Sequence, residues 1–181
     1  MRIITGLAKG RKLKTASSGV RPMAARVKKS VFDTLGDLND AEVLDVFAGS
    51  GALGIECVSR GAGSAVFVEK SQKVANIIGQ NIKECGFENK CKLIRADYKK
   101  AASILIENGR KFDIIFVMPP YALYKKVSRG ELEKCFSPLL SQNGRIVIEY
   151  ETDGDDGKAE SGVNRVTKKY GGTTVSIISA G

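Results

Sequence analysis

The chain has 181 residues, enough for one domain with a core of its own; 43% of them are hydrophobic, and the formal net charge is +9. No apolar run reaches the roughly 20 residues that cross a membrane, and no signal-peptide stretch opens the chain, which predicts a cytoplasmic protein without a membrane partner. Histidine is absent and the four cysteines form no C-x-x-C pair, so the usual zinc ligand sets cannot be assembled and we expect no metal.

The first 40 residues are predicted to form a basic N-terminal extension. Residues 1–5 and 11–15 indicate a short hairpin, and the apolar spacing over 24–35 predicts a helix. Residues 1–32 hold nine basic side chains and no acidic one, whereas the rest of the chain has twenty basic and twenty acidic residues. Such a block is typical of a surface that binds nucleic acid, and a solvated, merely solubilising arm is the alternative. The candidate nucleic-acid contacts are Arg2, Lys9, Arg11, Lys12, Arg21, Arg26, Lys28 and Lys29.

The stretch that follows has the pattern of a nucleotide-binding turn. An apolar strand predicted over 43–47 leads into Gly49 and Gly51 and then into a helix over 52–59. Glycine lets the backbone approach a ligand, and the free N–H groups of the helix start point to the same place. The spacing also suits NAD, but Asp45 offers an acceptor for the amine of a methionine moiety, which favours S-adenosylmethionine. The candidate cofactor residues here are Asp45, Phe47, Ala48, Gly49, Ser50 and Gly51.

Strands and helices then alternate along the chain. Further strands are predicted over 64–68, 91–95, 112–117 and 144–150, and further helices over 71–85, 98–107 and 129–140. Such units predict a mostly parallel sheet covered on both faces, with ligands at the carboxyl ends of its strands. Glu69 ends the second strand, where an acidic residue binds ribose hydroxyls, and Asp97 can accept from an adenine amine or simply cap a helix. Lys70 and Tyr98 complete the candidate cofactor set.

The fourth strand ends in Met118-Pro119-Pro120-Tyr121, the candidate catalytic turn. The two prolines make the turn rigid and remove two donors, which leaves carbonyl groups to accept, and Tyr121 offers a flat apolar ring. Such a turn suits a nucleobase, which can stack on the ring while its amine donates to the carbonyls. The alternative is a proline-ended strand with a core tyrosine.

The C-terminal part departs from this alternation. Residues 163–170 and 173–178 predict two strands that pair antiparallel at one edge of the sheet. The acidic stretch over 151–157 lacks the spacing of a calcium loop, so we expect a mobile acidic loop rather than a metal site. Residues 41–181 are therefore predicted to form one Rossmann-like α/β domain with an antiparallel C-terminal edge hairpin.

The turn at 117–121 resembles the (D/N)PP(Y/F) motif of methyltransferases that act on the amino groups of nucleic-acid bases. The whole chain is similar, nearly from end to end, to the RsmD-type bacterial rRNA guanine-N2 methyltransferases. The matching segments are Met1-Arg2-Ile3-Ile4, Gly6, Lys9-Gly10-Arg11-Lys12-Leu13, Arg21-Pro22, Arg26-Val27, Asp45 to Gly51, Ser59-Arg60-Gly61-Ala62, Val68-Glu69-Lys70 and Tyr170-Gly171. The N-terminal match separates this family from other methyltransferases with a PPY turn.

The resemblance implies a class I S-adenosylmethionine-dependent methyltransferase fold. It also implies methyl transfer to the exocyclic N2 of a guanine in small-subunit (16S) rRNA, with S-adenosylhomocysteine (SAH) as the second product. The partner would be that rRNA or a small-subunit assembly intermediate, and we expect a monomer. The Pro119 carbonyl would accept from the target amine and Tyr121 would stack on the base. Asp45 and the glycine turn would hold the methionine end of the cofactor, Glu69 its ribose and Asp97 its adenine.

Three positions depart from the family pattern, which usually carries aspartate where this chain has Ala25, Met118 and Gly172. Met118 matters most, because the resemblance implies that the aspartate accepts from the target amine, and a thioether is only a weak acceptor. Losing one such hydrogen bond costs on the order of 10²–10³ in rate, by analogy with other active sites. We expect an active methyltransferase whose rate Met118 can lower. The alternative is an attenuated or noncatalytic rRNA-binding assembly factor, and an NAD-dependent oxidoreductase is disfavoured by Asp45 and the PPY turn.

Overall fold

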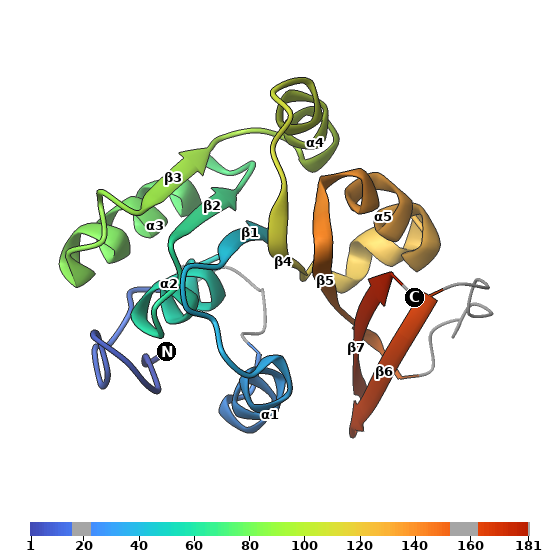
Figure 1. Cartoon of the computed structure of the whole chain (residues 1–181). Coiled ribbons are helices and arrows are strands. Elements are labelled where there is room, and N and C mark those ends of the chain that lie inside the picture. The colour runs from blue at the N-terminus through green and yellow to red at the C-terminus, as the bar shows by residue number, and fades with distance from the viewer. Residues whose placement is uncertain (16–22, 153–162, 181) are drawn as a thin grey trace.

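Seven strands form one sheet, and helices cover both of its faces (Figure 1). The structure is a computed structural model that describes residues 1–15, 23–152 and 163–180. Within these ranges, no helix combines the length and apolar character that crossing a membrane requires. The predicted loop 151–157 lies outside the described residues from 153 onward.

The elements follow the predicted alternation closely. The strands are β1 Glu42–Val46, β2 Ser64–Val68, β3 Cys91–Ile94, β4 Phe112–Val117, β5 Leu140–Glu151, β6 Val163–Tyr170 and β7 Thr173–Ala180. The α-helices are α1 Ala25–Leu35, α2 Ala52–Ser59, α3 Gln72–Cys85, α4 Tyr98–Glu107 and α5 Arg129–Phe136, with short 3-10 helices at η1 Tyr121–Lys125 and η2 Ser137–Leu139. The 3-10 helix η1, directly after the two prolines, was not predicted.

The strand order is β3-β2-β1-β4-β5-β7-β6, and β1 to β5 pair in parallel. The order reverses at β1, which has β2 on one side and β4 on the other. In open α/β sheets, ligands bind outside the carboxyl ends of the strands at such a reversal. The last strand β7 pairs antiparallel with both β5 and β6, which confirms the predicted antiparallel hairpin and the α/β fold.

Two apolar layers cover the sheet because successive strand residues point to opposite faces. Phe116 of β4 and Val147 of β5 belong to the layer that packs against α1, α2 and α3. Their chain neighbours Val117 and Ile148 belong to the layer under α4 and α5. Both β-strands are thus buried on two sides, which explains their continuous apolar runs.

The C-terminal end of α5 differs from the prediction of a helix over 129–140. The α-helix ends at Phe136, and Pro138, which lacks an N–H to continue the ladder, lies in the 3-10 turn that follows. The strand β5 then begins at Leu140, earlier than predicted, because a register shift opposite Phe112 accommodates the extra residues. A Cβ on Gly144 would lie 2.8 Å from the Phe112 carbonyl oxygen, so this shift requires glycine.

The N-terminal segment is less regular than the predicted hairpin. Only an isolated bridge joins Arg2 to Lys12, although Ile3 N donates to Arg11 O at 3.0 Å and Leu13 N donates to Met1 O at 2.8 Å. Ile3 and Leu13 are buried in the same apolar layer as α1 to α3. The segment is therefore packed on the body of the protein.

A buried carboxylate fixes this packing. Glu56 of α2 is fully buried, and its two oxygens accept from the backbone N–H groups of Ile4 at 2.8 Å and Thr5 at 3.1 Å. The ammonium of Lys28, from α1, lies 2.9 Å from Glu56 Oε2 and donates also to Arg2 O. Arg60 Nε supplies a fourth donor at 3.0 Å. One side chain thus joins the N-terminal segment, α1 and α2.

We predict that Glu56→Gln destabilises the protein by about 3–5 kcal/mol, because Lys28 is left as a buried charge without its counterion. Adding Lys28→Met should recover part of the loss. The control is Lys29→Met, which removes only an exposed i,i+4 pair with Asp33 worth roughly 0.3–0.5 kcal/mol. Urea unfolding measures all four free energies. Equal losses in the single and the double variant would contradict the buried-pair account.

Candidate active site

The turn after β1 has a strained backbone. Phe47, Gly49 and Gly51 have positive φ values of 60°, 57° and 76°. Phe47 is not a glycine, and such strain is concentrated at functional sites, where the surrounding structure sustains it. Gly51 is buried, and a Cβ there would lie 3.2 Å from Ile78 and 3.3 Å from Phe67, so a side chain would press on these core residues. Gly49, by contrast, is partly exposed, so the turn leaves backbone accessible at the reversal point of the sheet.

Asp45 lies inside β1 and is 1% exposed. Its Oδ2 accepts from Gly54 N at 3.0 Å, so the carboxyl group ties the strand to the start of α2 and shapes the turn between them. Burial raises the pKa of Asp45 to about 7; the Gly54 hydrogen bond opposes this rise and the nearby charge of Glu69 adds to it. The contact with a ligand amine, expected from the sequence, stays a prediction.

Glu69 follows β2 and reaches the glycine turn. Its Oε2 accepts from Gly49 N at 3.3 Å and its Oε1 from Ser71 N at 2.8 Å. The parallel pairing of β1 with β2 brings the two strand ends together, and Ala48 N donates to Val68 O at 3.1 Å. The sequence-predicted carboxylate thus lies against the glycine turn, and its contact with a ribose stays a prediction.

The candidates near β3 form a second small group. Asp97 caps α4 by accepting from Lys99 N at 3.1 Å, and its other oxygen lies 3.5 Å from Lys70 Nζ. Asp97 is therefore the helix cap that the sequence offered as an alternative, and its contact with adenine stays a prediction. Tyr98 is 7% exposed and its ring centroid lies 5.2 Å from that of Phe47. The two rings support the glycine turn from the side of α4.

Sequence reasoning missed Asn81, which is fully buried in α3. Its side-chain nitrogen donates to Ser50 O at 2.8 Å and to Lys14 O at 2.9 Å, while its oxygen accepts from Lys14 N at 2.8 Å. The glycine turn and the basic N-terminal segment therefore share one amide. The signal in the sequence was a polar residue on the otherwise apolar face of α3, between Ile78 and Ile82.

The candidate catalytic turn lies beside the glycine turn. The strands β1 and β4 are parallel neighbours, Val46 pairs with Val117, and Met118 N donates to Val46 O at 3.5 Å. Pro119 is buried, and within the described residues its carbonyl accepts no hydrogen bond, whereas the Pro120 carbonyl accepts from Leu123 N at 2.8 Å. The Pro119 carbonyl therefore keeps its capacity to accept from a ligand.

Tyr121 is anchored through its hydroxyl group. This oxygen lies 3.0 Å from Thr173 Oγ1 and donates to Glu149 Oε1 at 3.4 Å, while the Tyr124 hydroxyl donates to Glu149 O at 2.7 Å. Burial raises the pKa of Glu149, and the hydrogen bond from Tyr121 opposes the rise.

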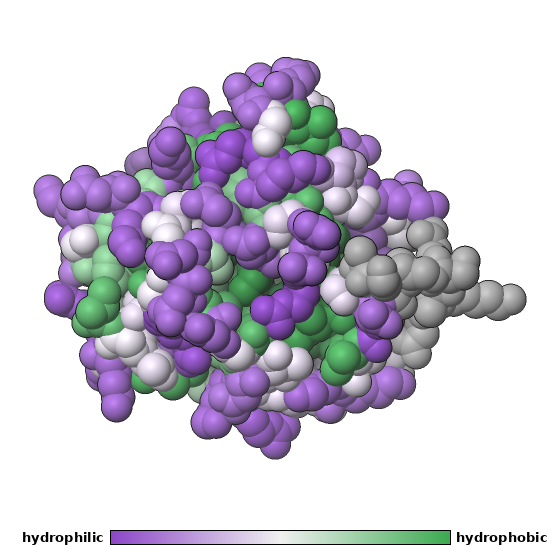
Figure 2. Space-filling model, in the orientation of Figure 1, coloured by the Kyte–Doolittle hydropathy of each residue, from purple (hydrophilic) through white to green (hydrophobic). Residues whose placement is uncertain are grey.

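In the space-filling view, hydrophobic residues are exposed in the hollowed middle of the face that carries α1, between hydrophilic residues (Figure 2).

Among the described residues, the predicted RNA contacts divide into exposed and buried side chains. Most of them are exposed, namely Arg2, Lys9, Arg11, Lys12, Arg26 and Lys29. Lys28 is 2% exposed and paired with Glu56, so its assignment as an RNA contact was wrong. It lies three and four residues before the buried Val31 and Phe32, so α1 turns this side chain inward despite its charge. Arg21 lies outside the described residues.

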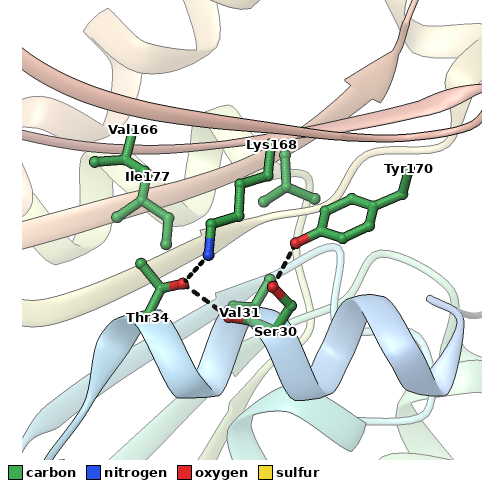
Figure 3. Close-up of a pocket in the computed structure, with 8 residues that line it drawn as sticks. Ser30, Val31, Thr34, Val166, Lys168, Tyr170 and Ile177 are labelled. Carbon is green, nitrogen blue, oxygen red and sulfur yellow. Dashed lines mark hydrogen bonds between the residues drawn. The ribbon is translucent and has the colours of Figure 1, made fainter.

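A small pocket lies where α1 meets the C-terminal hairpin (Figure 3). The Tyr170 hydroxyl donates to Ser30 Oγ at 2.6 Å, and Lys168 Nζ donates to Thr34 Oγ1 at 2.8 Å. In the close-up, both side chains point from β6 toward the helix. These bonds hold α1 against β6, so Tyr170, which the sequence singled out, orients a helix in this fold.

Solved structures and sequence relatives agree on what this fold is. The hypothetical protein TTHA0928 of Thermus thermophilus superimposes with a TM-score of 0.83 at 28% identity, over 99% of each chain. SMU.776, solved in complex with SAH, shares the fold with a TM-score of 0.67 at 16% identity, over 86% of this chain and 48% of the other. The fold is that of a class I S-adenosylmethionine-dependent methyltransferase.

The sequence comparisons narrow this class to a family. The family model described as "Conserved hypothetical protein 95" matches residues 1–179, and the chain belongs to this family. "Ribosomal RNA small subunit methyltransferase D" of Escherichia coli K12 is 37% identical over 151 residues, 82% of this chain and 71% of the relative. The protein of the same name from Haemophilus influenzae is 35% identical over 159 residues, 84% and 80% of the two chains. The RsmD-type resemblance is thereby confirmed.

We predict that Asp45→Asn makes the protein more stable than the wild type at neutral pH but not in acid. Below the unfolded-state pKa of 3.8, the carboxyl is protonated in both states and carries no penalty. As the pH rises to about 7, the unfolded state ionises first, and the wild type loses up to about 4 kcal/mol that the variant keeps. Urea unfolding across this range measures the difference; a difference independent of pH would contradict the assigned burial.

Proposed function

We propose that this protein transfers a methyl group from S-adenosylmethionine to the exocyclic N2 of a guanine in small-subunit rRNA, acting as a monomer. The observation that carries the proposal is the adjacency of two turns across the β1–β4 reversal. One has glycine backbone and a carboxylate beside it, and the other has a rigid di-proline backbone with an anchored aromatic ring. Between them, a methyl donor and a flat acceptor base can be held side by side.

The residues on the cofactor side fit S-adenosylmethionine. Glu69 accepts from Gly49 N in the glycine turn and from Ser71 N at the start of α3, and its carboxylate oxygens can also accept from ribose hydroxyls. We assign Asp45, with Phe47, Ala48, Gly49, Ser50 and Gly51, to the methionine end. Asp97 and Lys70, which form one exposed pair, are assigned to the adenine side, with Tyr98 supporting them. The cofactor supplies an electrophilic methyl group on a sulfonium sulfur.

The acceptor side needs to orient a weak nucleophile. The lone pair of a guanine amine is delocalised into the ring, so an acceptor at its N–H helps to localise that pair on nitrogen. The Pro119 carbonyl is such an acceptor, and Tyr121, fixed by Thr173 and Glu149, offers its ring for stacking. Proximity and orientation supply most of the acceleration, and the proton leaves to solvent, so the chain needs no histidine.

The choice of RNA as substrate rests on two supports. The relatives are named for a reaction on small-subunit ribosomal RNA. The exposed basic side chains of the N-terminal segment are suited to phosphate contacts, and Asn81 connects this segment to the glycine turn.

A noncatalytic rRNA-binding factor remains the second candidate, because Met118 places a thioether where a stronger acceptor would assist the amine. Incubation of undermethylated small subunits with radiolabelled S-adenosylmethionine separates the two. We expect label in the rRNA, and RNA binding without label would favour the noncatalytic factor. Calorimetry with NAD in parallel tests the oxidoreductase alternative, for which we expect no binding.

We predict that Glu69→Ala weakens S-adenosylmethionine binding by about 1.5–3 kcal/mol, the range for hydrogen bonds to a charged group. The control is Glu88→Ala, which removes an exposed carboxylate before β3 and should leave the affinity unchanged. Isothermal titration calorimetry measures both. A folded Glu69→Ala variant with wild-type affinity would remove Glu69 from the cofactor site.

We predict that replacing Arg11 and Lys12 with Ala weakens RNA binding and flattens its salt dependence. The log–log slope should fall by about 0.7–0.9 for each phosphate that the protein no longer neutralises. The matched control replaces Lys92 and Lys100, two exposed lysines outside the N-terminal segment, and should keep the slope. Filter binding at several salt concentrations gives the slopes. Equal slopes in both variants would mean that the RNA lies elsewhere.

A further inference from the structure

Glu149 lies at the carboxyl end of β5, directly beside the candidate catalytic turn. Val117 of β4 pairs with Ile148, so Met118 and Glu149 are the next residues in register. Phe116 and Val147 point to the α1–α3 layer, and strand alternation therefore directs Met118 and Glu149 to that same face. The structure thus brings a carboxylate next to a position where the chain itself has only a thioether.

The carboxylate of Glu149 is held but not neutralised. Within the described residues, its oxygens are in no ion pair, and their one hydrogen-bond donor is the Tyr121 hydroxyl at 3.4 Å. Two other glutamates with little exposure are compensated differently, since Glu56 has Lys28 and Arg60, and Glu133 has Arg129 and Arg165. Placing a carboxylate in a partly buried site without a cation is unfavourable, and burial raises its pKa. The group therefore retains most of its capacity to accept hydrogen bonds.

Guanine is the base whose edge matches such a group. Its N1–H and N2–H donors lie side by side and can be accepted together by the two oxygens of a carboxylate. Adenine and cytosine present an amine donor next to a ring-nitrogen acceptor, which a carboxylate repels. The Tyr121 hydroxyl donates to Glu149 Oε1 at 3.4 Å, so the carboxylate is held by the same residue whose ring would stack on the base.

Building on the proposed function, we propose that Glu149 is the residue that selects guanine, by accepting from N1–H and N2–H of the target base. It thereby supplies beside Met118 the strong acceptor that the Met118 thioether cannot provide. Glu149 adds no bond-breaking step: N2 bonds to the methyl carbon as the carbon–sulfur bond breaks, and the proton on N2 leaves to solvent. The same contact fixes the amine for transfer and rejects bases without the paired donors.

The test replaces Glu149 with Gln, which has the same shape but one acceptor and one donor. The position labelled by the wild type is first located by mass spectrometry of the rRNA. Small-subunit rRNA is then made by splinted ligation with either guanosine or 2,6-diaminopurine riboside there. The two bases share the N2 amine, but N1 carries a hydrogen in guanine and a lone pair in diaminopurine. The amide of glutamine can donate to that lone pair, whereas the carboxylate of glutamate has no donor.

We expect the wild type to prefer guanosine by about 10- to 100-fold in single-turnover rate, the usual value of one bidentate base contact. Glu149→Gln should lose that preference or reverse it, with unchanged S-adenosylmethionine affinity. The control is Glu151→Gln, an exposed glutamate two residues further along β5, which should behave as wild type. A merely structural role for Glu149 would slow both substrates equally.

A Glu149→Gln variant that keeps the wild-type preference for guanosine would overturn the selection by Glu149 and leave the proposed function standing. A wild-type protein that labels no guanosine in small subunits or in this RNA would overturn the proposed function, and the inference with it. The thermal melting curve and the cofactor affinity of the variant show that it is folded.

Discussion

The parallel pairing of β1 with β4 is the constraint on which the site depends. It sets the end of β1 beside the end of β4, with Met118 N bonded to Val46 O, so that the glycine turn and the di-proline turn emerge together. Each turn alone is ambiguous, because glycine turns bind many nucleotides and prolines end many strands. Their adjacency is the basis on which we propose a two-substrate site, with a nucleoside cofactor at one turn and a base at the other.

Buried polar contacts join the basic N-terminal segment, residues 1–15, to this site. Glu56 holds the backbone of residues 4 and 5 and the ammonium of Lys28, and Asn81 bonds both Lys14 and Ser50. Removing one partner of a buried pair typically costs about 3–5 kcal/mol, so these contacts fix the segment rigidly. The surface expected to meet RNA and the turn expected to hold the cofactor are therefore parts of one packed unit.

The sequence predicted the elements well where periodicity was strong. The bounds of α2, β2, α4 and β4 are those predicted, because buried strands and amphipathic helices carry their own pattern. The prediction failed in three places. The helix α5 ends early, before Pro138, a local signal that the prediction did not use. The longer β5 and the single bridge of the N-terminal segment depend on tertiary contacts, through the register shift at Gly144 and the packing of the segment on the body of the protein.

The sequence also singled out part of the candidate site, for a related reason. Glu69 and the di-proline turn were named because local spacing reveals strand ends, and Asp45 because it precedes the glycine turn. The structure brings all three to the same edge of the sheet. Lys28 was misassigned because its charge signals exposure, while its partner Glu56 lies far away in sequence. The sequence did not single out Asn81 or Glu149, because the contacts of each depend on which strand or segment becomes its neighbour, and β5 meets β4 only in the folded sheet.

The central claim is that cofactor and base meet at the β1–β4 reversal. A crystal structure of the protein with SAH tests it most directly. The account predicts the ribose hydroxyls at Glu69, the adenine near Asp97, and the sulfur facing the turn of Met118 to Tyr121. An SAH molecule bound elsewhere, for example in the groove lined by Leu7, Asp37 and Arg60, would contradict the account.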